Sequence, residues 1–135
     1  MSMTAGTEER PQGEVSLRTF AMPADTNSAG DIFGGWIMSQ MDLAGAASAR
    51  RHAQSRVVTI AVDAMTMHKP VFIGDELTCY TQLLKVGRTS LSVHVEAWVQ
   101  RGGFGELVKV TSATFAFVAL GEDRKPREVA PISKS

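Results

Sequence analysis

Apolar and polar side chains alternate with a period of two over residues 90–100. The apolar members of this run are Leu91, Val93, Val95, Ala97 and Val99. Such alternation is typical of a β-strand that has one face in the core. The pattern therefore predicts a strand over residues 88–100, following a turn at Gly87.

Four other runs have the composition of strands. They cover residues 15–22, 56–68, 76–86 and 107–120. Short turns rich in glycine precede the last three of the predicted strands, at 74–75, at Gly87 and at 102–105. Long strands joined by short turns favour an antiparallel meander.

Residues 34–53 have a different pattern. Alanine, leucine and methionine favour a helix here, and apolar residues lie almost all the way round it, which is typical of a buried helix. Arg50, Arg51 and His52 fall in its last turn, where positive charge complements the helix dipole. One apolar helix and one long sheet predict an α+β domain, with a curved antiparallel sheet of about five strands around the helix.

The length of 135 residues, 44% of them apolar, fits one globular domain. We expect that domain over residues 14–120, between flexible tails at 1–13 and 121–135. Fourteen basic and fourteen acidic side chains give a net charge of zero, which argues against a general nucleic-acid binder.

Other classes of protein are disfavoured by the residues that are absent. The single cysteine, Cys79, excludes an intrachain disulfide and a multi-cysteine zinc site, and suits a reducing cytoplasm. No secretory signal is visible, and polar residues interrupt the weakly charged stretch 32–49, which favours a buried helix over a membrane span. The histidines are scattered, so no metal site is expected. The glycines do not have the spacing of a nucleotide-binding loop, and the serines do not stand in the motif of a serine-hydrolase elbow.

Asp42 is the only charged residue between Asp31 and Arg50. A carboxylate in a buried helix costs several kcal/mol unless it is paired, hydrogen-bonded or protonated. The simple interpretation is a partly exposed Asp42, or one satisfied by Ser39 or a strand amide. The functional interpretation is a catalytic carboxylate in a semi-enclosed site.

Gly34 and Gly35 stand at the start of the same helix. The first N–H groups of a helix have no internal partners, and glycine lets a ligand oxygen approach them closely. The pair predicts an anion or oxyanion site, although it also fits an ordinary helix start. Because Gly35 and Asp42 are roughly 10 Å apart along the axis, we expect an antiparallel helix of a second subunit to bring such groups together.

A longer run around these residues resembles a family signature. Residues 21–42, AMPADTNSAGDIFGGWIMSQMD, are similar to the signature of hotdog-fold acyl-CoA thioesterases, most of all the YciA-like group. The likeness continues through RVVT at 56–59, HKPV at 68–71, the Gly-Asp pair at 74–75 and KVGRTS at 85–90. It implies a hotdog fold whose helix is wrapped by the sheet. It also implies a homo-oligomer, with active sites between two subunits paired edge to edge, and commonly a hexamer of three such dimers.

The resemblance also implies roles for matching positions. Asp42 matches the catalytic carboxylate, Asn27 an asparagine that positions water or substrate, and Gly34 and Gly35 the helix start that polarises the thioester carbonyl. The residues implied for binding substrate and CoA are Lys69, Lys85, Gly87, Arg88, Thr89 and Ser90. No metal and no cofactor are implied, since CoA is part of substrate and product. One departure is Met67-His68 before Lys69, so a preference for acyl chain length is not inferred.

The implied reaction is hydrolysis of acyl-CoA to a free acid and CoA. Asp42 would be a general base towards water, or a nucleophile that forms a mixed anhydride. Helix N-terminal amides would stabilise charge on the carbonyl oxygen by roughly 3–4 kcal/mol per donor. The main alternative is a non-catalytic acyl-CoA binder or sensor of the same fold. A hydratase or dehydratase is disfavoured, because no histidine accompanies Asp42.

Charge is distributed unevenly along the chain. Residues 1–49 have a net charge of −4 and residues 50–109 a net charge of +3. A locally basic rim could therefore hold the phosphates of CoA. Arg88, followed by Lys85, is the best candidate for such a contact, and a solvated turn is the alternative.

Overall fold

The structure, a computed structural model, describes residues 9–132. This part of the chain forms one long helix, α1 (Gly34–Ala53), and five strands. The strands are β1 (Glu14–Phe20), β2 (Arg56–Val62), β3 (Glu76–Val86), β4 (Ser90–Gln100) and β5 (Leu107–Leu120). Single 3-10 turns lie at η2 (Pro23–Asp25) and η3 (Arg101–Gly103). The predicted bounds of α1, β3 and β5 are confirmed.

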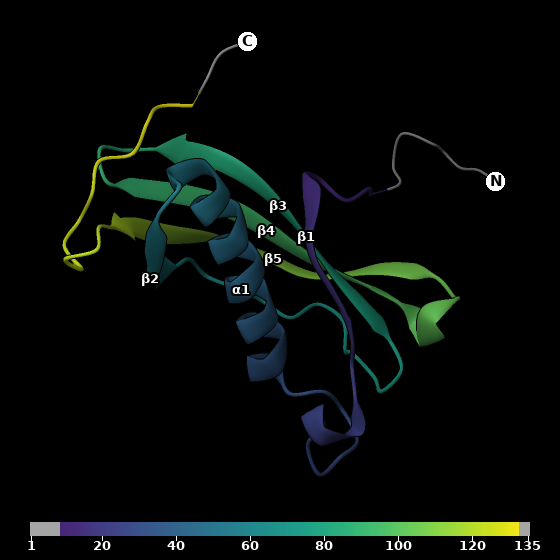
Figure 1. Ribbon diagram of the computed structural model, residues 1–135. Coiled ribbons are helices and arrows are strands. Elements are labelled where there is room, and N and C mark those ends of the chain that lie inside the picture. The colour runs from purple at the N-terminus through teal and green to yellow at the C-terminus, as the bar shows by residue number, and fades with distance from the viewer. Residues whose placement is uncertain (1–8, 133–135) are drawn as a thin grey trace.

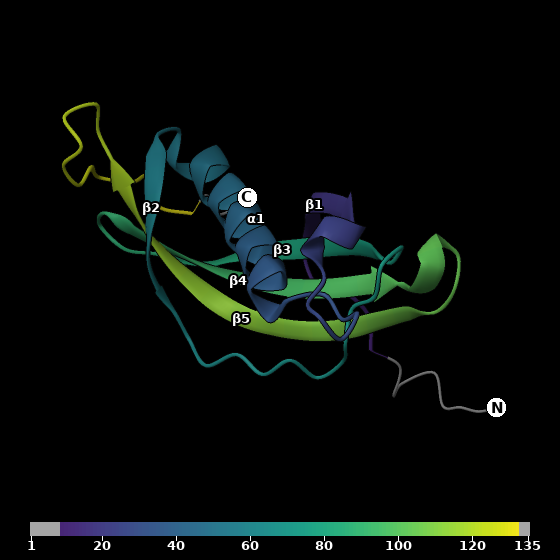
Figure 2. The same ribbon diagram turned by 90° about the horizontal axis from the view of Figure 1, so that it is seen from below.

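The strands form a single antiparallel sheet in the order β1-β3-β4-β5-β2. Strands β3, β4 and β5 make the expected meander, whereas β1 and β2 are placed at opposite edges of the sheet. Figure 1 and Figure 2 show α1 lying along the concave face of the sheet, which curves around it. The predicted α+β hotdog architecture is confirmed.

Strand β2 is shorter than the predicted strand over 56–68. It ends at Val62, after an irregularity in its register with β5 between Thr59 and Ala61. The following residues run beside β5 but make only scattered hydrogen bonds, such as His68 N–H to the carbonyl of Val110 at 2.9 Å. A composition that favours a strand does not produce one where the ladder of backbone hydrogen bonds is interrupted.

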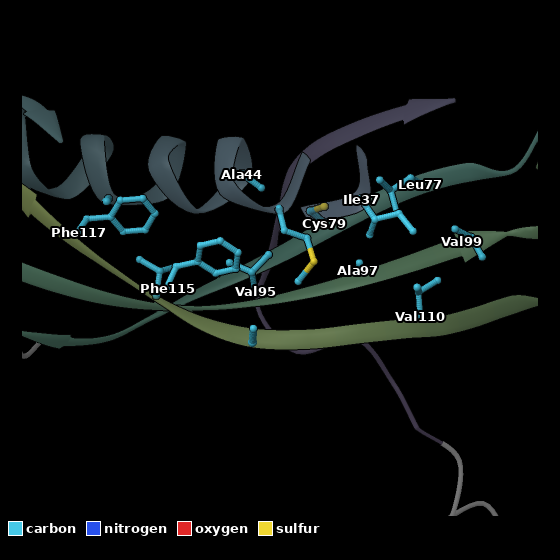
Figure 3. Close-up of a cluster of buried hydrophobic side chains, with 14 of the residues drawn as sticks. Ile37, Ala44, Leu77, Cys79, Val95, Ala97, Val99, Val110, Phe115 and Phe117 are labelled. Carbon is cyan, nitrogen blue, oxygen red and sulfur yellow. The ribbon is translucent and has the colours of Figure 1, made fainter. Parts of the chain in front are cut away.

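The core lies between α1 and the sheet. Figure 3 shows Phe115 and Phe117 of β5, Val95 of β4 and Ala44 of α1 in this layer. Gly45 brings the helix close to the sheet, because a Cβ at this position would lie 3.0 Å from the Phe117 ring. The small residues of α1 are therefore a packing requirement as well as a matter of helix propensity.

The expectation that α1 is buried all the way round is wrong for a single chain. Leu43 is 58% exposed and Met38 is 43% exposed, on the part of the helix that the sheet does not cover. One sheet covers only one side of a helix, so an apolar surface is left for another partner.

The segments that flank the sheet also contact it. The N–H of Gln12 donates to Oε1 of Glu96 at 3.2 Å, and the N–H of Val129 donates to the carbonyl of Arg88 at 2.9 Å. The outer parts of the predicted tails, residues 1–8 and 133–135, lie outside the described residues. Among residues 9–132, no helix is long and apolar enough to cross a membrane.

Candidate active site

Asp42 lies in the middle of α1, on the side that faces β2. The hydroxyl of Thr59 in β2 donates a hydrogen bond of 2.6 Å to Oδ1 of Asp42. The carboxylate is half-buried, and within residues 9–132 no other hydrogen bond to its side chain is formed. One carboxylate oxygen is therefore fixed by Thr59, while the other has free acceptor capacity.

The local pattern of β2 explains how Thr59 reaches the helix. Burial alternates along this strand, so that Val57 and Thr59 turn towards α1 while Val58 turns away. Ser39, the partner suggested by the sequence, instead donates to the carbonyl of Trp36 at 2.8 Å. The carboxylate is thus satisfied by a strand hydroxyl that is distant in the sequence.

The start of α1 is open to solvent. Its N-cap residue, Phe33, has no side-chain oxygen and makes no side-chain cap. Gly34 and Gly35 are exposed, and a Cβ built at Gly35 would have no other group of residues 9–132 within 4 Å. The first amides of the helix are therefore open to approach by a ligand oxygen.

Asn27 lies in the loop that leads into α1. Its Oδ1 accepts hydrogen bonds from the N–H groups of Ala29 (2.9 Å) and Asp31 (3.1 Å). These bonds hold the loop in shape at the start of the helix. The amide oxygen of Asn27 is thus in use, and its NH₂ group is the part that could act on a ligand.

The candidates for CoA binding are found in two different places. The turn 85–90 joins β3 to β4 at the end of the sheet where α1 finishes (Figure 1). Gly87 packs closely against Ser90 in this turn, since a Cβ there would lie 2.5 Å from Oγ of Ser90 and would require that side chain to rotate. Lys69 is elsewhere: with Trp98 and Lys109 it lines a hollow on the outer side of the sheet.

One chain does not bring all the predicted groups together. Gly35 and Asp42 are separated by seven residues of helix, roughly 10 Å along the axis. Asn27 lies beyond the start of α1, and the turn 85–90 lies near its other end. Asp42 and Thr59 are the pair that the fold joins directly.

Thr59 is a partner of Asp42 that the sequence alone did not identify. It stands within the run at 56–59 that carries the family resemblance, but nothing local marks it as a partner of Asp42. The signal that could have found it is the alternation of β2, which places Val57 and Thr59 on the same face of the strand.

Comparisons with known proteins agree with these observations. Residues 29–106 match the family model of the Thioesterase superfamily. The chain is 50% identical over 123 residues to acyl-CoA thioester hydrolase YciA of Salmonella typhimurium, a match that covers 89% of this chain and 92% of that protein.

Solved structures show the same likeness. A hexameric thioesterase from Yersinia pestis is 48% identical, with a TM-score of 0.86 over 90% of this chain and 99% of that one. A hexameric, broad-specificity acyl-coenzyme A thioesterase is 47% identical, with a TM-score of 0.87 over 95% of this chain and 88% of that one.

Proposed function

This chain belongs to the Thioesterase superfamily and to its YciA-like acyl-CoA thioester hydrolases, and we propose that Asp42 carries out the hydrolysis of acyl-CoA to a free acid and CoA. The observation that supports this role is the hydrogen bond of Thr59 to Oδ1 of Asp42. It orients a half-buried carboxylate in the helix and leaves its second oxygen free for the reaction.

The chemistry requires little more than a base and a polarised carbonyl. A thioester carbonyl is electrophilic and a thiolate is a good leaving group. The free oxygen of Asp42 takes a proton from the attacking water, or it attacks the carbonyl carbon and forms a mixed anhydride that water then cleaves. No cofactor takes part in either route, since CoA is itself a part of the substrate.

The amides at the start of α1 stabilise the negative charge that develops on the carbonyl oxygen. Gly35 permits this approach because the position of its missing Cβ is free of other groups from the described residues. Asn27, with its oxygen held by the loop, points its NH₂ group to water or substrate. This is the electrophilic half of the proposed site.

A second copy of the chain brings the two halves together. β2 is an edge strand, and its Ile60 is 58% exposed. An apolar sheet edge favours pairing with another strand, and the exposed Leu43 of α1 supplies further apolar surface. We place Asp42 of one subunit opposite the helix start of the other, in a homo-oligomer that is at least a dimer. The hexameric relatives favour a trimer of such dimers.

The test is a thiol-release assay over a panel of acyl-CoA substrates. We expect turnover by the wild-type enzyme and its near-complete loss in Asp42→Ala, with CoA binding retained. Turnover by Asp42→Ala at the wild-type rate would remove Asp42 from the mechanism. Binding of acyl-CoA by the wild-type protein without thiol release would instead favour the non-catalytic binder.

A subunit-mixing experiment tests the shared site. Asp42→Ala chains and Gly35→Val chains are each expected to be inactive, whereas their mixed dimers contain one intact site and recover activity. No recovery after denaturation and joint refolding would place both groups in the same chain.

Single-turnover hydrolysis in ¹⁸O-water separates the general-base route from the anhydride route, because the anhydride route introduces label into the carboxylate of Asp42. The cytoplasmic location proposed from the single cysteine is tested by fractionating the cells of origin.

A further inference from the structure

Basic side chains gather at one end of the molecule. Figure 1 and Figure 2 show the end of α1, the start of β2, the turn between β3 and β4, and the segment after β5 at this end. The basic residues that these elements contribute are Arg50, Arg51, His52, Arg56, Lys85, Arg88, Arg124, Lys125 and Arg127. This concentration is hidden in a chain whose total charge is zero.

Three of these arginines line one hollow. Arg50 at the end of α1, Arg56 at the start of β2 and Arg124 after β5 surround a space of about 230 Å³. The other lining residues are Val57, Val58 and Leu120, so the hollow has an apolar floor and no carboxylate. A neighbouring hollow shares Arg56 but contains Glu122, which offsets part of its positive charge.

No ion pair of the described part of the chain neutralises these three guanidinium groups. Among residues 9–132, no ion pair includes Arg50, Arg56 or Arg124, and all three are exposed. Converging like charges repel one another, and an anion placed between them removes that repulsion. The planar fork of arginine fits phosphate oxygens in particular.

The backbone at Arg124 is also unusual. Its φ of 64° lies in the left-handed region, which favours glycine. The tight turn is closed by a bond from the N–H of Arg124 to the carbonyl of Gly121 at 2.9 Å. Arginine at a backbone position that suits glycine is explained if its guanidinium group binds a ligand.

The hollow stands at a defined distance from Asp42. Arg50 follows Asp42 by eight residues, which is about 12 Å along the helix. Arg56 precedes Thr59 by three residues, which is about 10 Å along β2. Both elements that hold the Asp42–Thr59 pair therefore lead to the same cluster of arginines. In acyl-CoA, the pantetheine arm likewise separates the thioester from the phosphates.

We infer that Arg50, Arg56 and Arg124 form an anion subsite for the phosphate groups of the CoA nucleotide. The inference rests on the proposed function for the identity of the anion, and it adds a subsite distinct from the turn 85–90. Arg56 and Arg124 bind the nucleotide and take no part in the bond-breaking step. They therefore select for CoA esters over esters of shorter thiols.

The test compares Arg56→Gln and Arg124→Gln with the control Lys125→Gln. All three lose one positive charge at the same end of the molecule, but Lys125 does not line the hollow. Each arginine variant is expected to raise the KM for acyl-CoA about tenfold. The kcat should be unchanged, as should the kinetics with the matching acyl-pantetheine, which lacks the phosphates. Lys125→Gln should change KM less than about twofold, because an exposed, unpaired charge contributes little.

Three results would overturn the subsite. They are an unchanged KM in both arginine variants, an equal loss of activity with both substrates, and a change in oligomeric mass, which would make the hollow a subunit contact. Calorimetric titration with CoA itself keeps this test separate from catalysis. If the wild-type protein binds CoA and Arg56→Gln weakens that binding about tenfold, the subsite holds even where thiol release is absent.

Discussion

The hydroxyl of Thr59 lies 2.6 Å from Oδ1 of Asp42, and this contact ties the middle of α1 to the edge strand β2. It is made across 17 positions of sequence. It determines which of the two carboxylate oxygens remains available. Thr59 is thus a positioning residue for the proposed reaction.

Replacing Thr59 by valine keeps the shape and removes the hydrogen bond. We expect kcat to fall about ten- to 150-fold, in line with the roughly 1.5–3 kcal/mol of a bond to a charged group, while the KM for acyl-CoA stays near that of the wild type. Thr59→Ser retains the hydroxyl and should recover most of the rate. Steady-state kinetics on the three proteins provide the measurement. If the serine variant is as slow as the valine variant, packing and not the hydrogen bond is responsible.

Gly35→Ala should have opposite effects on stability and activity. A Cβ here meets no other group within 4 Å in the part of the chain that the structure describes, and alanine favours the helix by about 1 kcal/mol over glycine. Thermal unfolding should therefore show a variant at least as stable as the wild type. Thiol release should fall by two to three orders of magnitude, the order expected for loss of an oxyanion contact.

The control for this variant is Gly74→Ala, at a glycine with a φ of 90° and with free space for a Cβ. It should lose stability because of its backbone conformation, and it should retain thiol release at temperatures well below its unfolding. Unchanged activity in Gly35→Ala would show that no ligand approaches the start of α1 closely.

The buried carboxylate of Asp75 forms an ion pair with the partly exposed Arg101, and the pair joins two turns at the far end of the sheet. The carboxylate of Asp75 accepts bonds from Nη1 of Arg101 (2.6 Å) and the N–H groups of Gly102 (3.0 Å) and Phe72 (2.9 Å). Arg101→Met leaves this buried charge without its cation, and we expect a loss of about 3 kcal/mol in the free energy of unfolding.

Urea denaturation measures that loss. The matched control is Lys109→Met, which should cost less, because Nζ of Lys109 lies 3.9 Å from the carboxylate of the buried Glu96, whereas Nη1 of Arg101 lies 2.6 Å from that of Asp75. If the two variants lose the same free energy of unfolding, the Arg101–Asp75 pair contributes no more to stability than the Lys109–Glu96 contact.

Cys79 is predicted to be unreactive in the folded protein. Burial raises the pKa of its thiol from 9.0 to about 12, so the thiolate that attacks a disulfide reagent is scarce at pH 8. Ellman's reagent should leave the native protein unmodified and label it rapidly in urea. Fast labelling of the native state would show that the core opens at Cys79.

The raised pKa of Cys79 also has a consequence for stability. Above pH 9 the unfolded thiol ionises while the folded thiol keeps its proton, so the contribution of Cys79 to stability is full below pH 9 and is lost towards pH 12. The free energy of unfolding should fall more steeply with pH in the wild type than in Cys79→Ala, by up to about 1.4 kcal/mol per pH unit. Parallel curves for the two proteins would contradict this coupling.

Short-range patterns along the chain are enough to predict much of the fold. The alternation over 90–100 and the composition of 34–53 predicted β4 and α1, because the period of apolar residues depends on neighbours along the chain. Asp42 became a candidate as the lone charge in that apolar helix, and the resemblance of residues 21–42 to a known signature indicated the family. The predicted strand over 56–68 was too long, since composition does not show where the backbone ladder stops.

The tertiary structure decided what lies beside Asp42 and what lies far from it. Strand order places β2 beside β5 at the sheet edge, and this placement brings Thr59 to Asp42 and Arg56 to Arg124. It also leaves Gly35 and Lys69 apart from that pair in a single chain. Local patterns specify which face of an element is apolar, but long-range partners depend on how the whole sheet is assembled, so these contacts could not be read from the sequence alone.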